Sequence, residues 1–281
     1  MKAQQKTLLN KLFEIAKRDM PDNTFPTFPK IKKPKSNQVV HIRKEDWKQL
    51  LKGINALSGK NAGKTLSISE YENLPFNKNK LDNERNWVDL HDALLVEWFF
   101  YLRAEDMPRL RVEWFTKIKD EESTEIQVDL EETKGDREKH TSTHYRSEAV
   151  KFWERLSERR GKTGWLICPH VERSQEGGGE YSVLKRLNTL LKMAIKNLLP
   201  SYADKDISWT NIRHTAFRLT LEDIPELGQT GTPINEFARN GFTSPDMLYK
   251  TYLKYIDSKS QAKIARKKIN PMEYTLVRKV D

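Results

Sequence analysis

The stretch YLRAEDMPRLRVEW, residues 101–114, decides the fold class because two kinds of secondary structure meet in it. Residues 89–102, which run into it, are the most apolar part of the chain, and their spacing predicts a core helix. Directly after it, the pattern changes to short runs that are typical of strands. A core helix that leads into a small sheet predicts an α+β domain rather than a helical bundle.

The expected sheet has three short strands. They are predicted at residues 112–118, 124–132 and 138–144. The second run alternates most clearly, with apolar residues at every other position from Ile126 to Leu130. Residues 134–136, Lys-Gly-Asp, supply a turn between the second and third runs, so we expect antiparallel pairing.

Helical spacing of apolar residues dominates the rest of the chain. It covers residues 3–18, resumes at Arg43, and returns in the segments 147–160, 181–198, 208–221, 233–240 and 244–256. The last three segments begin with an N-cap residue or an early proline. We therefore expect an α+β fold that is mainly helical, with a small three-stranded antiparallel sheet.

Composition excludes several classes of protein. The apolar share of 37% suffices for a packed core, so wholesale disorder is not expected. A single cysteine, Cys168, cannot form an internal disulfide, and no Cys and His residues have metal-ligand spacing. The longest apolar run is broken by Glu97 and is about half the length that a membrane span needs. We expect a cytoplasmic protein with neither a metal nor a cofactor and with no membrane contact.

Positive charge is concentrated at the two ends of the chain. Residues 1–64 hold 15 Lys and Arg against 5 Asp and Glu, which equals the whole net charge of +10, and residues 254–281 hold 8 against 3. Residues 24–36, TFPTFPKIKKPKS, form a basic linker whose prolines prevent a helix. Basic flanks suggest a polyanionic partner, although solvated lysines would look the same.

Three stretches, in this order, resemble the tyrosine recombinases and phage integrases. Residues 101–114 resemble the segment that carries the first phosphate-binding arginine, and IRHTAF, residues 212–217, resembles the segment that carries the second. FARNGFTSPDMLYKTY, residues 237–252, resembles the terminal helix pair that ends in the nucleophilic tyrosine. ETKGDR, residues 132–137, stands where the β-hairpin lysine of the family would be. The resemblance covers roughly residues 42–256.

The resemblance implies a role for each matching residue. Arg103 and Arg213 would bind the scissile phosphate, because two guanidinium groups can hold its non-bridging oxygens. Tyr252 would attack phosphorus and store the bond covalently, so that no ATP or metal is needed. Lys134 would protonate the leaving deoxyribose oxygen. Contacts to DNA are expected from Lys30, Lys32, Lys33 and Lys35 of the linker, and from Thr210 and Thr243.

Several of these residues also have a simpler explanation. Tyr249, Tyr252 and Tyr255 lie at helical spacing, which is also typical of an aromatic packing stripe, and Tyr249 is the second candidate for the nucleophile. His214, beside Arg213, is interpreted as a buried structural histidine. A lysine in a turn, such as Lys134, is often only a solvated charge.

The sequence departs from the family at two positions. The family usually has a histidine three residues before the second arginine and a histidine or tryptophan nine residues before the nucleophile, but here these positions are Thr210 and Thr243. Threonine cannot serve as a base near neutral pH. The expected activity is therefore a reduced or specialised one.

The chain is interpreted as a site-specific DNA recombinase or integrase that works through a 3′-phosphotyrosine intermediate, in the cytoplasm and associated with the nucleoid. Residues 1–41 would be a remnant core-binding helix and basic linker, 42–256 the catalytic domain, and 257–281 a basic tail exchanged between protomers of an oligomer on double-stranded DNA. One alternative is a degenerate integrase that binds DNA without cleaving it. The other is a protein, associated with RNA or with a host partner, that shares only the fold.

Overall fold

The computed structural model describes residues 11, 14–16, 18–19, 40–77, 80–119, 123–130, 140–173, 178–228 and 232–252. The chain divides into two units, residues 1–39 and 40–281. In the first unit the described residues, within or next to the expected helix 3–18, are helical. The linker lysines, the 134–136 turn with Lys134, and the tail 257–281 lie outside the described residues.

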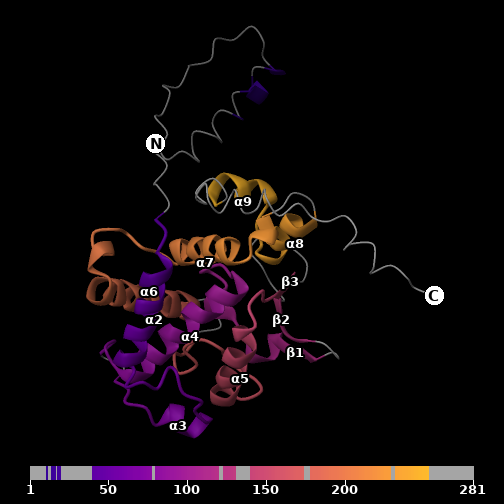
Figure 1. Cartoon of the computed structure of the whole chain (residues 1–281). Helices are drawn as coiled ribbons and strands as arrows, with labels where there is room; N and C mark the ends of the chain where they lie inside the picture. The colour runs from indigo at the N-terminus through magenta and orange to yellow at the C-terminus, as the bar shows by residue number, and fades with distance from the viewer. Residues whose placement is uncertain are drawn as a thin grey trace, which may run out of the picture. The chain divides into compact units, whose positions relative to one another are not determined.

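The second unit is an α+β domain that is mainly helical, with a small antiparallel sheet, as the sequence predicts. Its helices and strands are drawn in Figure 1. In chain order they are α2 (Lys44–Leu57), α3 (Ile68–Glu72), α4 (Glu84–Phe100), η1 (Met107–Arg109), η2 (Val112–Trp114), β1 (Phe115–Lys119), β2 (Thr124–Leu130), β3 (His140–Thr143), α5 (Glu148–Arg160), α6 (Gly178–Leu198), η3 (Pro200–Tyr202), α7 (Trp209–Asp223), η4 (Pro225–Gly228), α8 (Thr232–Asn240) and α9 (Pro245–Thr251).

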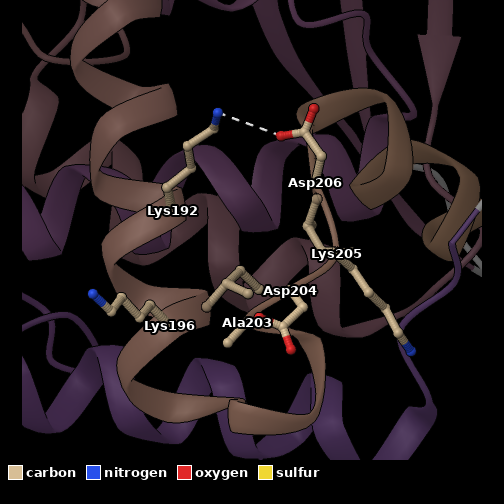
Figure 2. Close-up of a pocket in the computed structure, with 8 residues that line it drawn as sticks. Lys192, Lys196, Ala203, Asp204, Lys205 and Asp206 are labelled. Atoms are coloured by element: carbon tan, nitrogen blue, oxygen red, sulfur yellow. Dashed lines mark ion pairs between the residues drawn. The ribbon is translucent and has the colours of Figure 1, made fainter.

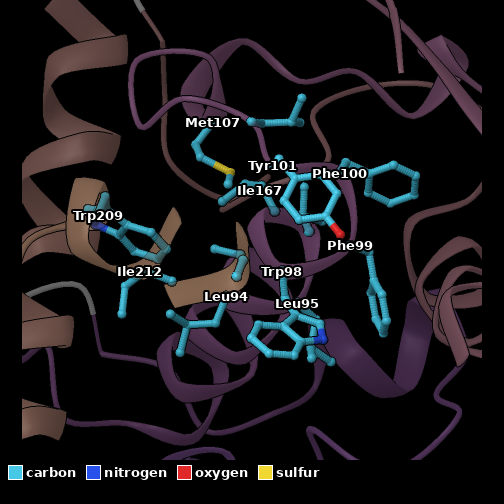
Figure 3. Packing of buried hydrophobic residues seen from close by; sticks show 14 of the residues in the cluster. Leu94, Leu95, Trp98, Phe99, Phe100, Tyr101, Met107, Ile167, Trp209 and Ile212 are labelled. Carbon is cyan, nitrogen blue, oxygen red and sulfur yellow. The ribbon is translucent and has the colours of Figure 1, made fainter. Parts of the chain in front are cut away.

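The helix α4 forms the centre of this unit. Every residue from Asn86 to Phe100 is buried, which is typical of a helix that is packed on all sides. It contacts α2, α5, α6 and α7. Figure 3 shows Leu94 and Trp98 of α4 in one apolar cluster with Trp209 and Ile212 of α7. The packing of α7 on α4 fixes the helix that carries Arg213.

The strands pair in the order β1-β2-β3, and both pairs are antiparallel. Phe115 lies opposite Val128, and Val128 lies opposite Ser142. The apolar face of β2 is buried, and β2 contacts α5. The alternation that predicts this strand therefore also identifies the side that faces the core.

The prediction of a strand from residue 112 is wrong for its first three residues, which form the 3-10 helix η2. The backbone amide of Val112 donates to the carbonyl of Gly164 at 2.9 Å, and that of Leu166 donates to Leu110 at 2.9 Å. Residues 110–112 therefore pair with the loop after α5, and not with β2. The short helix α3 and the other 3-10 turns are also missing from the sequence prediction.

Buried ion pairs join α4 to α5. Arg159 contacts Asp92 at 3.2 Å, and Arg160 contacts Asp89 at 2.6 Å and Asp92 at 3.0 Å. All four side chains are almost fully buried. The hydroxyl of Tyr71 in α3 also donates to Asp89 at 2.8 Å, so this network connects three helices.

Among the described residues, no helix is both long enough and apolar enough to span a membrane.

Candidate functional site

Arg103 follows the sharp end of α4. Tyr101 ends the helix in the left-handed conformation, with φ of 54°, which turns the chain back toward the domain. The carboxylate of Asp106 then accepts the backbone amide of Arg103 at 3.1 Å. Through Nη2, the partly exposed guanidinium of Arg103 donates to the carbonyl of Phe242 at 3.3 Å.

Arg213 reaches the same carbonyl from α7. This helix begins with a capping box, in which Ser208 and Asn211 satisfy each other's amides. Nη2 of Arg213 donates to the carbonyl of Gly241, and also lies 3.4 Å from the carbonyl of Phe242. The two arginines, far apart in the sequence, therefore converge on one backbone oxygen.

The turn between α8 and α9, which contains Gly241 and Phe242, has an unusual backbone conformation. Phe242 has φ of 53°, an uncommon conformation for a residue with a side chain. A Cβ at Gly241 would lie 2.3 Å from the ring of Phe217, so only glycine fits there. The same tight turn presents the carbonyls of Gly241 and Phe242 to the two arginines.

Tyr252 closes the site from the end of α9. Its side chain is buried, and its ring packs on Phe217 with centroids 5.2 Å apart. Its hydroxyl shares a hydrogen bond with Nδ1 of His214, the residue after Arg213. Burial raises the pKa of Tyr252 well above its usual value, and the positive charge of Arg213 opposes part of this increase.

A second histidine lies beside this pair. The ring centroid of His41 lies 6.4 Å from the ring centroid of His214 and 6.4 Å from that of Tyr252. The backbone next to His41 is fixed on α7, because the amide of Ile42 donates to Thr215 at 3.1 Å and the side chain of Asn211 donates to the carbonyl of Val40 at 3.2 Å. We call Arg103, Arg213, His41, His214 and Tyr252 the Tyr252 cluster.

Burial keeps both histidines neutral near pH 7. The pKa of His214 falls to about 4, first through burial and then through the neighbouring His41 and Arg213. The pKa of His41 also falls to about 4, first through burial and then through the charge of Arg218. Each neutral ring can therefore accept a hydrogen bond at one of its nitrogens at physiological pH.

A buried carboxyl, Glu97 of α4, faces this group of charges. Burial raises its pKa well above the usual range, and the charge of Arg213 opposes this increase. Among the described residues, neither carboxyl oxygen of Glu97 has a hydrogen-bond partner. The pKa of Arg213 is itself lowered by burial, against the charges of Tyr252 and Glu97.

The remaining sequence candidates differ in their placement. Thr210 is exposed in the first turn of α7, and the backbone amide of Thr243 donates to Ala238 at 2.9 Å. Within the described part of the chain, the buried hydroxyl of Tyr249 has no hydrogen-bond partner. Tyr255 and Lys134 lie outside that part.

Asn240 links this turn to the sheet. Its side-chain oxygen accepts the amide of Thr143 at 2.7 Å, and its side-chain nitrogen donates to the carbonyl of Thr143 at 2.7 Å. Thr143 ends β3, the strand that returns from the segment with Lys134. Asn240 thus fixes one end of that hairpin next to Gly241 and Phe242.

A separate cleft of about 340 Å³ lies between α6 and the segment 203–207. Figure 2 shows Lys192 directed toward Asp206, at 3.4 Å, whereas Lys196 and Lys205 point in different directions. The positive charges of its lysines and the negative charges of its aspartates largely balance, so the cleft does not present one sign of charge to a ligand.

In the described ranges, no group of three His, Cys, Asp or Glu residues is arranged to hold a metal ion.

Sequence reasoning missed His41 and Glu97 and interpreted His214 as structural. The neighbours of His41 come from α7 and α9, at the other end of the chain, so nothing local to residue 41 identifies it. The only local signal for Glu97 is a charge within an apolar run.

Comparisons with models of known families, with curated proteins and with solved structures give no match.

Proposed function

We propose that the chain cleaves and rejoins DNA strands through a covalent bond between Tyr252 and a 3′-phosphate. The observation that carries this proposal is the convergence of Arg103 and Arg213 on the carbonyl oxygen of Phe242. Two guanidinium groups that share one acceptor oxygen are placed to share the oxygens of one phosphate. The proposal also agrees with the resemblance to tyrosine recombinases, on which the residue roles rest.

The chemistry follows from the charges of the cluster. Attack of a hydroxyl on a phosphodiester increases negative charge on the non-bridging oxygens, and preorganised cations stabilise that charge. Arg103 is partly exposed and Arg213 is more deeply held, so a phosphate would enter past Arg103 and displace the carbonyl of Phe242. By the resemblance to tyrosine recombinases, Lys134 would protonate the departing 5′-oxygen.

The competing proposal is a protein that binds DNA without cleaving it. Two observations favour it: Thr210 and Thr243 replace the expected rings, and the hydroxyl of Tyr252 is buried against His214. A binder would need the basic flanks and the arginines, but not the tyrosine.

One experiment separates the two proposals. The full chain is incubated with nicked duplexes that carry 30 random base pairs, and covalent adducts are recovered from denaturing gels and sequenced. The enzyme forms adducts that Arg103→Ala and Arg213→Ala each reduce at least 100-fold, while Arg186→Ala, a half-buried arginine of α6, changes them little. Binding in a gel-shift assay without any adduct supports the binder instead.

An oligomer on DNA, joined by exchange of the tail 257–281, is part of the same proposal and rests on the sequence alone. Deleting residues 260–281 should abolish the higher-order complexes on DNA and leave binding of a single protomer nearly intact. Complexes of unchanged size would show that the tail is only a basic extension.

A further inference from the structure

The hydrogen bond between His214 and Tyr252 gives the cluster a candidate base that the sequence motif alone does not supply. In the tautomer with the proton on Nε2, Nδ1 of His214 accepts the hydroxyl of Tyr252. Nδ1 of His214 lies at the hydroxyl of Tyr252, and the two ring centroids are 5.3 Å apart. A hydroxyl nucleophile needs a base within hydrogen-bond distance of its proton. His214 is the group that meets this requirement among the described contacts of Tyr252.

The position of His214 on its helix also compensates for a missing residue. The family pattern expects a histidine at position 210, where this chain has threonine. Residues 210 and 214 are four apart in α7, so they lie on the same face of the helix, one turn from each other. A ring at position 214 can therefore serve the same side of the site as a ring at position 210.

We propose that His214 is a catalytic residue that accepts the proton of the Tyr252 hydroxyl during strand cleavage and returns it during rejoining. This proposal rests on the proposed function and deepens it. In the forward step the O–H bond of Tyr252 breaks, and its proton moves to Nδ1 of His214. The tyrosine oxygen forms a bond to phosphorus as the bond from phosphorus to the 5′-oxygen breaks, and the 5′-oxygen takes a proton from Lys134. The reverse step restores every group.

The surroundings of His214 fit this role. A base must be unprotonated before the reaction, and the low pKa of His214 satisfies that condition near pH 7. The same burial disfavours the imidazolium that proton transfer creates, so the transfer needs added negative charge in the site. The charged and titratable groups that act on the pair are Arg213 of α7, which acts on both residues, and His41 before α2, which acts on His214. Arg213 is in turn affected by Glu97 of α4 and by Arg103 and Asp106, which follow α4. The entering phosphate offsets the charge of Arg103 and Arg213, so it favours the protonated imidazole that cleavage creates.

The test uses His214→Asn in the full chain. The amide oxygen of asparagine can still accept the hydrogen bond of Tyr252, but it cannot take up the proton. His144→Asn is the matched control, because His144 is also a half-buried histidine, lies after β3 and is not part of the Tyr252 cluster. Single-turnover adduct formation is measured on the duplex sequence that the wild type cleaves best in the random pool.

We expect His214→Asn to bind that duplex like the wild type and to form the adduct at least 100-fold more slowly at pH 7. Its rate should rise about tenfold per pH unit up to pH 9, because hydroxide then removes the proton. Adduct formation by His214→Ala should be partly restored by added imidazole, and His144→Asn should stay within threefold of the wild type.

Two results overturn the proposal in different ways. If the wild type forms the adduct and His214→Asn does so within threefold of it, His214 is not the base, while the proposed function stands. If the wild type forms no adduct on any duplex of the pool, the proposed function fails, and the role of His214 fails with it. In either case, ¹⁵N NMR of the His214 ring reports whether Nδ1 accepts a hydrogen bond that Tyr252→Phe removes.

Discussion

At the scale of single residues, the site places ionisable groups where burial and charge act against each other. Glu97 and Arg213 are both removed from water, and each stabilises the charged form of the other. Tyr252 experiences the same opposition between burial and Arg213. Burying such a group of charges costs folding free energy, and under the proposed function a bound phosphate would offset that cost.

Glu97→Gln tests this cost. Because the pKa of Glu97 is higher in the folded chain than in the unfolded chain, protonation favours folding, and the stability from this group falls as pH rises above about 4.3. The variant should match the wild type near pH 4.5 and be more stable at pH 8 by about 1–3 kcal/mol. Urea unfolding at both pH values measures the difference, and the histidines cancel because both proteins contain them.

The opposite sign at pH 8 would contradict this account of Glu97. A variant that is less stable than the wild type there would mean that Glu97 is ionised and forms a net stabilising pair with Arg213.

At the scale of elements, the sequence predicts local patterns well and long-range contacts poorly. The α4 prediction succeeds because its apolar residues identify a core helix, and the alternation in β2 also identifies its buried face. The first residues of the expected strand at 112 fail because Gly164, which is distant in the sequence, accepts the amide of Val112. His41 belongs to the site only through the contacts of residues 40–42 with α7, which no local pattern encodes.

The buried pairs between α4 and α5 should dominate the stability of that side of the domain. Asp92 accepts from both Arg159 and Arg160, and all three side chains are almost inaccessible to water. Asp92→Ala should therefore cost about 3–5 kcal/mol, because it removes the carboxylate partner of the buried Arg159 and leaves Arg160 with Asp89 alone. Chemical denaturation measures this loss.

Glu154→Ala is the matched control for Asp92→Ala. Its partner Lys117 is about as exposed as Glu154 itself, so that surface pair should contribute less than about 1 kcal/mol. Equal losses in the two variants would show that burial does not decide the strength of these pairs.

At the scale of the whole molecule, the excess of positive charge lies at the two ends of the chain. The net charge of +10 equals the excess within residues 1–64, and residues 40–42 connect this segment directly to α7. Under the proposed function, the linker would add contacts to DNA that are separate from those of Arg103 and Arg213.

Replacing Lys30, Lys32, Lys33 and Lys35 with glutamine should weaken binding to all DNA sequences alike. The slope of log affinity against log salt concentration should flatten by up to about 4 units, about 0.9 for each lost phosphate contact. Fluorescence anisotropy between 50 and 300 mM salt, with labelled duplexes of two unrelated sequences, measures it.

The matched control replaces four exposed lysines of α2 and α6, which are Lys52, Lys185, Lys192 and Lys196. It changes the net charge equally and should leave the slope almost unchanged. If both quadruple variants flatten the slope by the same amount, the effect comes from net charge, and the linker makes no specific phosphate contact.

The central claim is that Tyr252 attacks the phosphate that Arg103 and Arg213 hold, and the chain offers a direct way to test it. Trypsin cleaves after Arg239, Lys250, Lys254 and Lys259, so Tyr249, Tyr252 and Tyr255 fall into three separate peptides. Mass spectrometry of the nuclease-trimmed covalent adduct then identifies the linked tyrosine. We expect the nucleotide phosphate on the peptide TYLK, residues 251–254. A nucleotide on the peptide that carries Tyr249 or Tyr255, or on none of the three, would contradict the claim.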